Sequence, residues 1–499
     1  MKILLDTNIF ISSEDYKIIS GSLQILEKIF RKYPIKVYLH SVSVKDINED
    51  NNEERKQIML SKMNTYPSLE NPPEAEKDKT FMQLVGTPSS TNDKIDNEIL
   101  YSLYKNCEDF LITEDQKLIK KAYRAGLKDR IFNVALAIVY LESVYGKKYP
   151  QQPHLIMEQT YSLKLNDVFF DSFRKDYSEF DKWISKISSE DRPCWVYKEN
   201  GDIKAILILK EETEGIELVD RIIPVKKILK ICSLKVEKVG YKIGELLLKI
   251  AFQYCIKNNI LEIYLTHFIK EDDQLIDLIM SLGFENIGKN KRGEYIYHKQ
   301  IVVDKYKTNS SPIIEIDKKY YPSFVDSPEI KKFLIPILPR YHDILFPDWP
   351  GLKQYKLTHF MNMTEVSISG NTIRKLYLSN SKIKRLKEGD ILLFYRSKEQ
   401  LITTLCIVEK IISTSKSNEI LRLGVNRTVY PLREIEGFKK PVLCILFMQN
   451  FYFKKPISLK DLKKNNIINY APQSITEISP LKYDQIKSLG ELDGRFTIN

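Results

Sequence analysis

Short apolar runs that end at an acidic residue recur through the first 115 positions of the chain. The opening run, residues 1–5, ends at Asp6, and residues 110–112 are followed within three positions by Asp115. Residues 36–44 form a similar run just before Asp46. Such runs predict buried strands, and open α/β sheets gather their functional groups at the carboxyl ends of parallel strands. We therefore expect these acids to meet at one sheet edge.

A fourth acid, Asp96, lies in residues 92–100, whose apolar positions have helical spacing. Adjacent carboxylates repel one another and are tolerated when a cation neutralises them. Hard divalent cations such as Mg²⁺ or Mn²⁺ prefer these oxygen ligands. The sequence thus predicts a metal-dependent phosphodiesterase with Asp6, Asp46, Asp96 and Asp115 as catalytic and metal-binding residues, and with Asn8 and Thr113 contacting the substrate or capping nearby turns.

The four segments 5–8, 41–46, 96–100 and 111–115 together resemble the PIN-domain ribonucleases, a family of small α/β metal-dependent nucleases. The resemblance implies an α/β/α sheet domain and cleavage of RNA. The family usually carries Glu as its second acid, so Glu49 and Asp50 are alternatives to Asp46. Asp93 is likewise an alternative to Asp96.

The length of 499 residues, 43% of them hydrophobic, allows about three domains. Gly, Pro and charge concentrate at residues 145–153 and 305–312, which predicts domains at 1–147, 155–305 and 312–499. The six cysteines show no paired spacing, which argues against disulfides or a zinc site. Without a long apolar run or a signal-peptide pattern, we expect a cytoplasmic protein. The net charge of +11 suits a polyanion such as RNA.

The middle segment carries a strand at 228–236, a glycine-containing turn and a helix from Gly244. Unpaired backbone N–H groups and the helix dipole make such a turn an anion site. The segment, with strands at 193–197, 203–209, 262–266 and near Tyr295, resembles the GNAT acetyltransferases. The resemblance implies a mixed α/β fold and acetyl-coenzyme A bound by Leu234, Val236, Val239, Gly240, Tyr241, Lys242, Ile243, Gly244 and Glu245.

This GNAT-like segment departs from its family at several positions. Val239 stands where the loop usually has Gln or Arg, and Lys242 stands where it usually has its first glycine. Lys242 adds a positive charge that could contact phosphate. Ile279 aligns with the tyrosine that often protonates the departing thiolate. Of the residues beside the expected cleft, His267 and Glu262 are either candidate bases or structural groups.

The last segment suggests a small β-barrel: a basic helix over 381–388, a Gly389-Asp390 turn, and strands from 391 and 401. Together with residues 472–475 near the end, this pattern resembles the ASCH and EVE branches of the PUA-like superfamily, which bind RNA or modified nucleotides. We expect phosphate contacts or base stacking from Lys384, Arg385, Tyr395 and Arg396, with Lys382 and Lys387 as further cations; a solvated lysine face beside a core aromatic is the alternative.

Three interpretations follow. The favoured one is a Mg²⁺- or Mn²⁺-dependent endoribonuclease whose other domains position or modify the substrate. Family analogy suggests a toxin that acts on tRNA, with an antitoxin as partner and a homodimeric nuclease domain. The second is an N-acetyltransferase for a protein, small amine or aminoacyl-tRNA, with a vestigial nuclease domain. The third is an RNA-binding scaffold that senses acetyl-coenzyme A.

Overall fold

The structure, a computed structural model, divides into two compact units. Unit 1 comprises residues 1–150 with 415–425 and 431–439, and unit 2 comprises residues 151–414, 426–430 and 440–499. The residues described are 1–14, 21–50, 52–69, 72–145, 155–190, 192–199, 201–237, 242–269, 273–302, 312–351, 370, 372–424, 427–430, 432–438 and 440–498.

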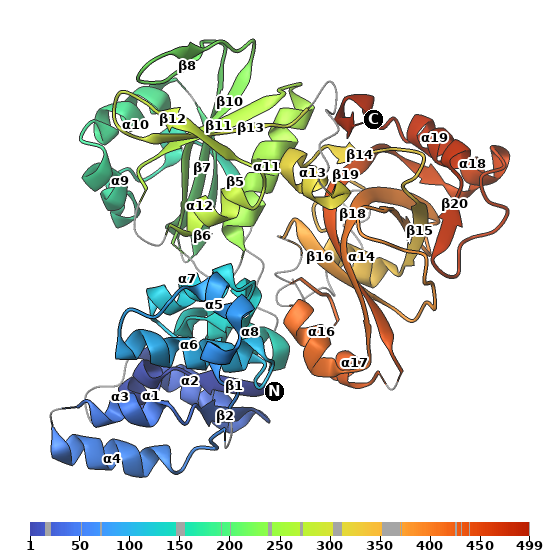
Figure 1. Ribbon diagram of the computed structural model, residues 1–499. Coiled ribbons are helices and arrows are strands. Elements are labelled where there is room, and N and C mark those ends of the chain that lie inside the picture. The colour runs from blue at the N-terminus through green and yellow to red at the C-terminus, as the bar shows by residue number, and fades with distance from the viewer. Residues whose placement is uncertain are drawn as a thin grey trace. The chain divides into compact units, whose positions relative to one another are not determined.

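Unit 1 is built on a four-stranded parallel sheet with strand order β2-β1-β3-β4 (Figure 1). Parallel neighbours need crossover connections, which are helical here. The strands are β1 (Lys2–Leu5), β2 (Lys36–Leu39), β3 (Phe110–Ile112) and β4 (Ile131–Phe132). The helices are α1 (Thr7–Glu14), α2 (Gly21–Lys32), α3 (Ser43–Asn48), α4 (Glu53–Met63), α5 (Lys79–Val85), α6 (Thr91–Tyr104), α7 (Gln116–Arg124) and α8 (Val134–Tyr145).

Alternate residues of the central strands of this sheet enter two different hydrophobic clusters. In β1, Ile3 and Leu5 pack with α2 and α8, whereas Leu4 packs with α6 and α7. Buried strands of parallel sheets are apolar on both faces for this reason. Unit 1 therefore has three layers, with helices on both sides of the sheet.

Two helices from the C-terminal part of the chain, α16 (Ser417–Leu423) and α17 (Leu432–Glu436), also belong to unit 1. Arg422 of α16 donates through Nη2 to Asp109 Oδ1 at 2.8 Å and through Nη1 to Asn106 Oδ1 at 2.8 Å. Asp109 is buried and also accepts the backbone N–H of Lys2 at 2.8 Å. A partly buried, charge-assisted pair therefore fixes α16 beside the start of β1.

The first sheet of unit 2 has seven strands in the order β12-β13-β11-β10-β7-β6-β5, mostly antiparallel, with β10 and β11 as its parallel pair. The strands are β5 (Leu155–Gln159), β6 (Pro193–Glu199), β7 (Asp202–Glu212), β10 (Ile228–Val236), β11 (Glu262–His267), β12 (Glu285–Lys289) and β13 (Tyr295–Gln300), with a small hairpin of β8 (Ile216–Glu217) and β9 (Ile222–Ile223). The helices are α9 (Asp171–Asp176), α10 (Phe180–Ser189), α11 (Ile243–Lys257) and α12 (Gln274–Met280).

Helices cover both faces of this sheet as well. Ala205, Leu207 and Leu209 of β7 share a cluster with α11, while Ile206 and Ile208 pack with α10 on the other face. The alternation follows from the two-residue period of a strand. Units 1 and 2 together thus form the mixed α/β, multi-sheet structure that the sequence predicts.

The second sheet of unit 2 has six strands in the order β16-β19-β18-β17-β15-β20. Its edge strands β16 and β20 do not pair with each other in the described residues, so the sheet stays open where a closed barrel was expected. The strands are β15 (Lys332–Ile337), β16 (Arg374–Ser379), β17 (Ile391–Arg396), β18 (Leu401–Thr414), β19 (Val442–Ser458) and β20 (Thr476–Ile478), beside a two-stranded sheet of β14 (Phe324–Val325) and β21 (Thr497–Ile498). The helices are α13 (Ile313–Tyr320), α14 (Pro339–Leu345), α18 (Leu459–Lys464) and α19 (Pro480–Leu489).

The basic helix expected over 381–388 is wrong, because residues 380–387 form an irregular segment. The Ser379 side chain accepts the backbone N–H of Ser381 at 3.2 Å, and the Ser381 side chain accepts that of Ile383 at 3.3 Å. Side-chain bonds of this kind compete with helical backbone bonds.

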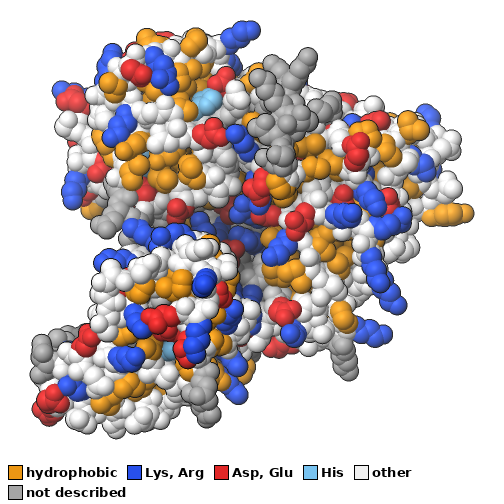
Figure 2. Space-filling model, viewed as in Figure 1, with side chains coloured by type: hydrophobic (Ala, Val, Ile, Leu, Met, Phe, Trp, Pro, Cys, Tyr) orange, Lys and Arg blue, Asp and Glu red, His pale blue; other side chains and the backbone are white. Residues whose placement is uncertain are grey.

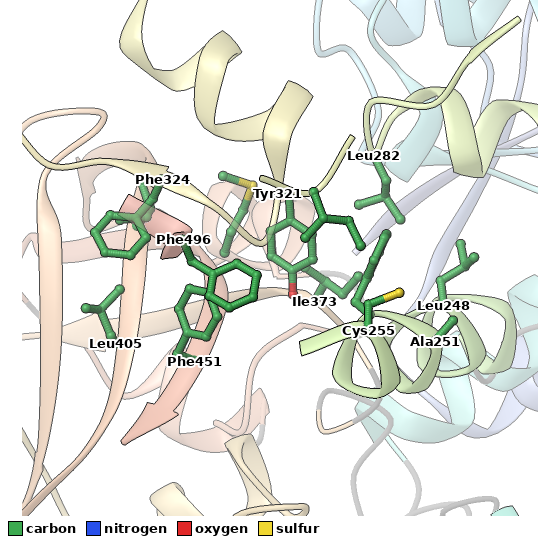
Figure 3. Packing of buried hydrophobic residues seen from close by; sticks show 14 of the residues in the cluster. Leu248, Ala251, Cys255, Leu282, Tyr321, Phe324, Ile373, Leu405, Phe451 and Phe496 are labelled. Atoms are coloured by element: carbon green, nitrogen blue, oxygen red, sulfur yellow. The ribbon is translucent and has the colours of Figure 1, made fainter. Parts of the chain in front are cut away.

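One hydrophobic cluster spans both sheets of unit 2. Figure 3 shows Leu248, Ala251 and Cys255 of α11 beside Tyr321 and Ile373, with Phe451 and Phe496 farther along the same cluster. The Tyr321 hydroxyl donates to the Gln449 carbonyl at 2.7 Å, so its one polar atom is satisfied inside the core. The two sheets of unit 2 are therefore packed as one body.

None of the helices in the described part of the chain has the length and apolar character that a bilayer span requires.

Candidate functional sites

The predicted acids of unit 1 lie at the carboxyl edge of its sheet. Asp6 directly follows β1, and Asp115 follows β3 and begins α7. The backbone N–H of Asp6 donates to the Ile112 carbonyl at 3.0 Å, which joins the two strand ends. Asp46 lies in α3 and Asp96 in α6, and these two helices are in contact.

Hydroxyl groups organise this edge. Thr113 Oγ1 donates to Asp6 Oδ2 at 2.6 Å and accepts the backbone N–H of Asp115 at 2.9 Å. Asp115 Oδ1 in turn accepts the backbone N–H of Leu118 at 2.9 Å and so caps α7. Asn8, also predicted to contact substrate, is exposed.

The four carboxylates of this acidic cluster, Asp6, Asp46, Asp96 and Asp115, affect one another electrostatically. Burial, with repulsion from Asp6 and Asp115, raises the pKa of Asp96 from 3.8 to about 7. Burial also raises the pKa of Asp6 to about 6, with smaller contributions from Asp115 and Asp46. Burial raises the pKa of Asp46 as well. Perturbed carboxyls in one place are typical of functional sites.

Of the alternatives to these acids, Asp93 and Asp50 have partners outside the cluster, whereas Glu49 acts on Asp46. Asp93 forms an ion pair with Lys121 and accepts the backbone N–H of Ser89 at 2.7 Å. Asp50 accepts the backbone N–H of Asn52 at 2.9 Å and lies 3.5 Å from Arg55. Glu49 contributes to raising the pKa of Asp46.

The cluster does not form a metal-coordination site as its side chains are placed. Within the described ranges, no group of three or more His, Cys, Asp and Glu side chains is positioned to hold a metal ion. Asp6 and Asp115 each use a carboxylate oxygen for the protein hydrogen bonds given above. As placed, the side chains of the described residues therefore do not converge on one point that a Mg²⁺ or Mn²⁺ ion could occupy.

The second candidate site lies in unit 2, where two parallel strands separate. β10 pairs with β11 over only three residues, Leu229–Ile231 against Ile263–Leu265. Beyond a bulge at Ile231 and Ser233, β10 continues to Val236 and pairs there with β7, with no second strand partner among the described residues. Leu234 and Val236, both predicted ligand contacts, lie on this continuation and pack partly against the core.

Helix α11 begins at Ile243, seven residues after Val236. Its N-cap, Lys242, has left-handed backbone angles (φ 54°, ψ 30°) and makes no side-chain cap bond. Its first turn contains Ile243, Gly244 and Glu245, and a Cβ added at Gly244 would lie 3.2 Å from Leu278 of α12. The predicted residues Val239, Gly240 and Tyr241 lie outside the described residues.

The side chain of Glu245 points into the protein. Glu245 is buried, and its Oε1 accepts the backbone N–H of Ile373 at 2.7 Å and that of Arg374 at 3.3 Å. The Glu245 carboxylate is therefore engaged inside the protein, and only the backbone N–H of Glu245 could contribute to an anion site.

The structure separates the two candidate bases. Glu262 Oε2 is 2.7 Å from His298 Nε2 at the beginning of β11, away from the strand separation. His267 ends β11, and its Nε2 is 2.5 Å from Asp273 Oδ2. Ile279 is fully buried in the core, as an apolar residue at that position should be.

A polar group that the sequence analysis missed lies near His267. Buried Glu294 accepts from the Tyr177 hydroxyl at 2.9 Å and from Thr266 Oγ1 at 3.0 Å, and its Oε2 accepts from Asn290 Nδ2 at 2.7 Å. These residues come from separate parts of the chain and form no local motif. Only the pairing of β11 with β13 brings Glu294 beside Thr266.

The predicted contacts in the C-terminal segment differ in accessibility. Lys384 and Arg385 are exposed, and Arg385 lies 3.1 Å from Glu477. Tyr395 is fully buried in the core, so its ring is not available for stacking on a base. Arg396 is also buried, with Asp343 and with Glu399, whose Oε1 it contacts at 2.9 Å.

Figure 2 shows Lys and Arg side chains spread over the visible face and interspersed with Asp and Glu. The net positive charge is therefore not gathered into one patch on that face, and it does not by itself locate a polyanion site.

The chain matches no protein-family model and no curated protein. Among solved structures it is similar to an ASCH protein from Zymomonas mobilis, with 12% identity over 32% of this chain and 95% of that one, at a TM-score of 0.23. It is also similar to the PaiA N-acetyltransferase from Thermoplasma acidophilum in complex with coenzyme A, with 20% identity over 28% of this chain and 83% of that one, at a TM-score of 0.20. At these TM-scores the likenesses carry no conclusion about this chain.

The raised pKa of Asp96 predicts a pH-dependent effect of Asp96→Asn. Between pH 4 and 7 the folded chain binds more protons at this carboxyl than the unfolded chain, so the free energy of unfolding falls as the pH rises. Asn removes this loss. We expect Asp96→Asn to raise the melting temperature of unit 1 at pH 8, by roughly 2–4 °C for each 1 kcal/mol gained, and to raise it much less at pH 5.

Calorimetric scans at both pH values measure this difference. The matched control is Glu54→Gln, an acid-to-amide change at an exposed position of α4. An equal shift at pH 5 and pH 8, or a shift no larger than the control's, contradicts the electrostatic account of the cluster.

Proposed function

We propose that this chain is an N-acetyltransferase that uses acetyl-coenzyme A, with the site in unit 2. The observation that carries the proposal is the early separation of β10 from β11, with α11 beginning just after β10. An extended ligand can bond to the unpaired edge of a strand as an added strand would. Residues 155–305 also carry the sequence pattern that resembles the GNAT acetyltransferases: a strand, a glycine-containing turn and a helix, with further strands on either side.

The pantetheine arm of the coenzyme suits the edge of β10, because its amide groups can bond to backbone groups of residues 232–236 on the side that no second described strand pairs. Its pyrophosphate suits the first turn of α11, where backbone N–H groups and the helix dipole favour negative charge. Lys242 adds a positive charge at the same point. These residues would hold the ligand, and the bound thioester supplies the acetyl group.

His267 is the base in this proposal. Because Asp273 contacts Nε2, that nitrogen carries the proton and Nδ1 is left to accept one. As the acceptor amine attacks the thioester carbonyl carbon, the carbon–sulfur bond breaks and coenzyme A leaves as the thiolate. The proton of the amine passes to Nδ1 of His267.

The acceptor class is an amine of a protein, a small molecule or an aminoacyl-tRNA. The proposed PUA-like character of residues 312–499 favours an acceptor attached to RNA, for which exposed Lys384 and Arg385 offer phosphate contacts. A cytoplasmic location stays a prediction.

Binding of the coenzyme is expected to depend on Lys242. Charge reversal by Lys242→Glu places a negative charge where the pyrophosphate binds, and should weaken acetyl-coenzyme A binding by about tenfold or more, as one charge-assisted hydrogen bond is worth about 1.5–3 kcal/mol. Isothermal titration calorimetry on the full chain measures it. Lys242→Gly, which suits the left-handed backbone, should weaken binding less, and Lys186→Glu at an exposed position of α10 is the charge-matched control. No heat from the unchanged chain refutes both the acetyltransferase and the sensing interpretations.

Transfer is expected to depend on His267. His267→Gln should lower kcat by about 10²–10⁴ without changing the affinity for acetyl-coenzyme A, since general-base catalysis contributes a factor of this size. Release of the coenzyme A thiol in the presence of polyamines, peptides or aminoacyl-tRNA measures the rate. His298→Gln, in the neighbouring strand β13 and in contact with Glu262, is the matched control. Binding without any thiol release from the unchanged chain favours the sensing scaffold over the enzyme.

A second candidate function, cleavage of RNA by a PIN-type domain, is favoured by one observation. Asp6, Asp46, Asp96 and Asp115 interact electrostatically at one sheet edge, and the pKa of Asp96 is raised to about 7. This is an arrangement that a bound cation or a protonated carboxyl relieves. An antitoxin and a nuclease homodimer remain predicted partners of this function.

RNA cleavage predicts different outcomes with and without these carboxyls. The unchanged chain should cut total RNA when Mg²⁺ or Mn²⁺ is added. Asp6→Asn and Asp96→Asn should each lower the cleavage rate by at least about 100-fold, the usual scale for a lost catalytic group. Gel analysis of the RNA measures it, with Glu54→Gln as the control. Equal cutting by all proteins points to a contaminating nuclease and sinks the hypothesis.

A further inference from the structure

A pocket of about 310 Å³ lies on unit 1 beside the acidic cluster. Its lining includes Lys45, the neighbour of Asp46 on α3, and Ile95 and Glu98 of α6, which lie on a different face of that helix from Asp96. The two helices that carry acids of the cluster thus also build the pocket. A volume of this size is at the lower end for ligand sites, and it suits a group as small as one nucleobase.

The pocket combines apolar walls with a few polar groups. Val42, Pro72 and Ile95 supply apolar surface, and Lys45 supplies positive charge. The Lys94 ammonium is paired with Glu76 Oε1 at 2.6 Å, and Glu74 adds a second carboxylate to the lining beside Glu98. Few, convergent polar groups on an apolar surface are the usual composition of a site that recognises a small planar ligand.

Glu98 is the acceptor that such a ligand would meet. Its Oε2 accepts the backbone N–H of Ala75 at 3.0 Å, so the carboxylate is held in one orientation. A fixed carboxylate suits a ligand with neighbouring N–H donors. Among the RNA bases, only guanine presents a ring N–H next to an exocyclic amino group.

His40 supplies an unsatisfied donor in the same wall. The backbone N–H of Val42 donates to His40 Nδ1 at 3.1 Å, and burial lowers the pKa of the imidazole to about 4. The ring is therefore neutral and carries its proton on Nε2. This nitrogen is buried and has no hydrogen-bond partner in the described part of the chain. Because Nε2 has almost no accessible surface, it lies behind the pocket wall and is not a contact of the proposed ligand.

We propose that this pocket binds the guanine base of a single-stranded RNA nucleotide. Glu98 accepts from the N1–H and the 2-amino group of the base, and Lys45 reaches its phosphate. The inference rests on the second candidate function and adds a substrate class to it: RNA held through a guanine by α3 and α6, the two helices that also carry Asp46 and Asp96.

The test uses guanosine 5′-monophosphate, which contains no internucleotide bond, so its binding is independent of cleavage. Calorimetry on the full chain should show binding at least fivefold tighter than for the adenosine, cytidine and uridine monophosphates. Glu98→Gln, which can keep its bond to Ala75, should weaken guanosine monophosphate binding by about tenfold, the scale of one base-edge contact. Glu54→Gln is the matched control.

A second variant separates loss of binding from loss of folding. Ser41→Trp, at an exposed position of the lining, should abolish guanosine monophosphate binding while the circular dichroism spectrum and the melting temperature stay unchanged. Equal affinity for all four nucleotides, absence of binding, or unaltered binding by both variants overturns the proposal. RNA cleavage that persists alongside such a result leaves the nuclease function standing and rejects only the guanine pocket.

Discussion

Helix α11 is the element on which the arrangement of unit 2 depends. Its apolar face completes the core that runs from the seven-stranded sheet to the six-stranded sheet. Its polar positions make specific bonds as well: buried Lys249 donates to Asp348 at 2.9 Å and to Gln449 at 3.0 Å. Burying a lysine is costly unless it is paired, so these bonds fix how the helix lies against the second sheet. The N-terminus of the same helix forms one end of the proposed coenzyme site.

The proposed coenzyme site would be linked to the C-terminal part of unit 2 through Glu245. Glu245 lies in the first turn of α11, and its carboxylate holds the backbone at Ile373 and Arg374, where β16 begins. A ligand that orders the first turn of α11 therefore also acts on the edge strand of the second sheet. Because any such coupling is reciprocal in binding free energy, a ligand of the second sheet would alter coenzyme affinity by the same factor.

Local sequence patterns predicted the strands well and the side-chain partners poorly. The expected strand at 228–236 coincides with β10, and the apolar runs before Asp6 and Asp115 are strands. An aromatic beside a cation is a common RNA-contact pattern, and it left base stacking by Tyr395 and Arg396 and a core position for the aromatic as alternatives; Tyr395 lies in the core. Arg396 is instead buried with Asp343, which is distant in sequence, and no local pattern predicts that pairing. Glu245 was assigned to the coenzyme through the GNAT resemblance, and no local pattern could show that its carboxylate bonds to backbone about 130 residues away.

The most direct test of the central claim is hydrogen–deuterium exchange of the full chain with and without acetyl-coenzyme A. The account predicts slower exchange at residues 232–237, which cover the last part of β10 and the residue after it, and at residues 243–246 of α11. The ligand would bond to backbone groups in both segments. It also predicts weaker protection near 373–374, through Glu245. Unchanged exchange at β10 and α11 under saturating ligand, or protection confined to unit 1, would contradict the claim that this strand separation binds the coenzyme.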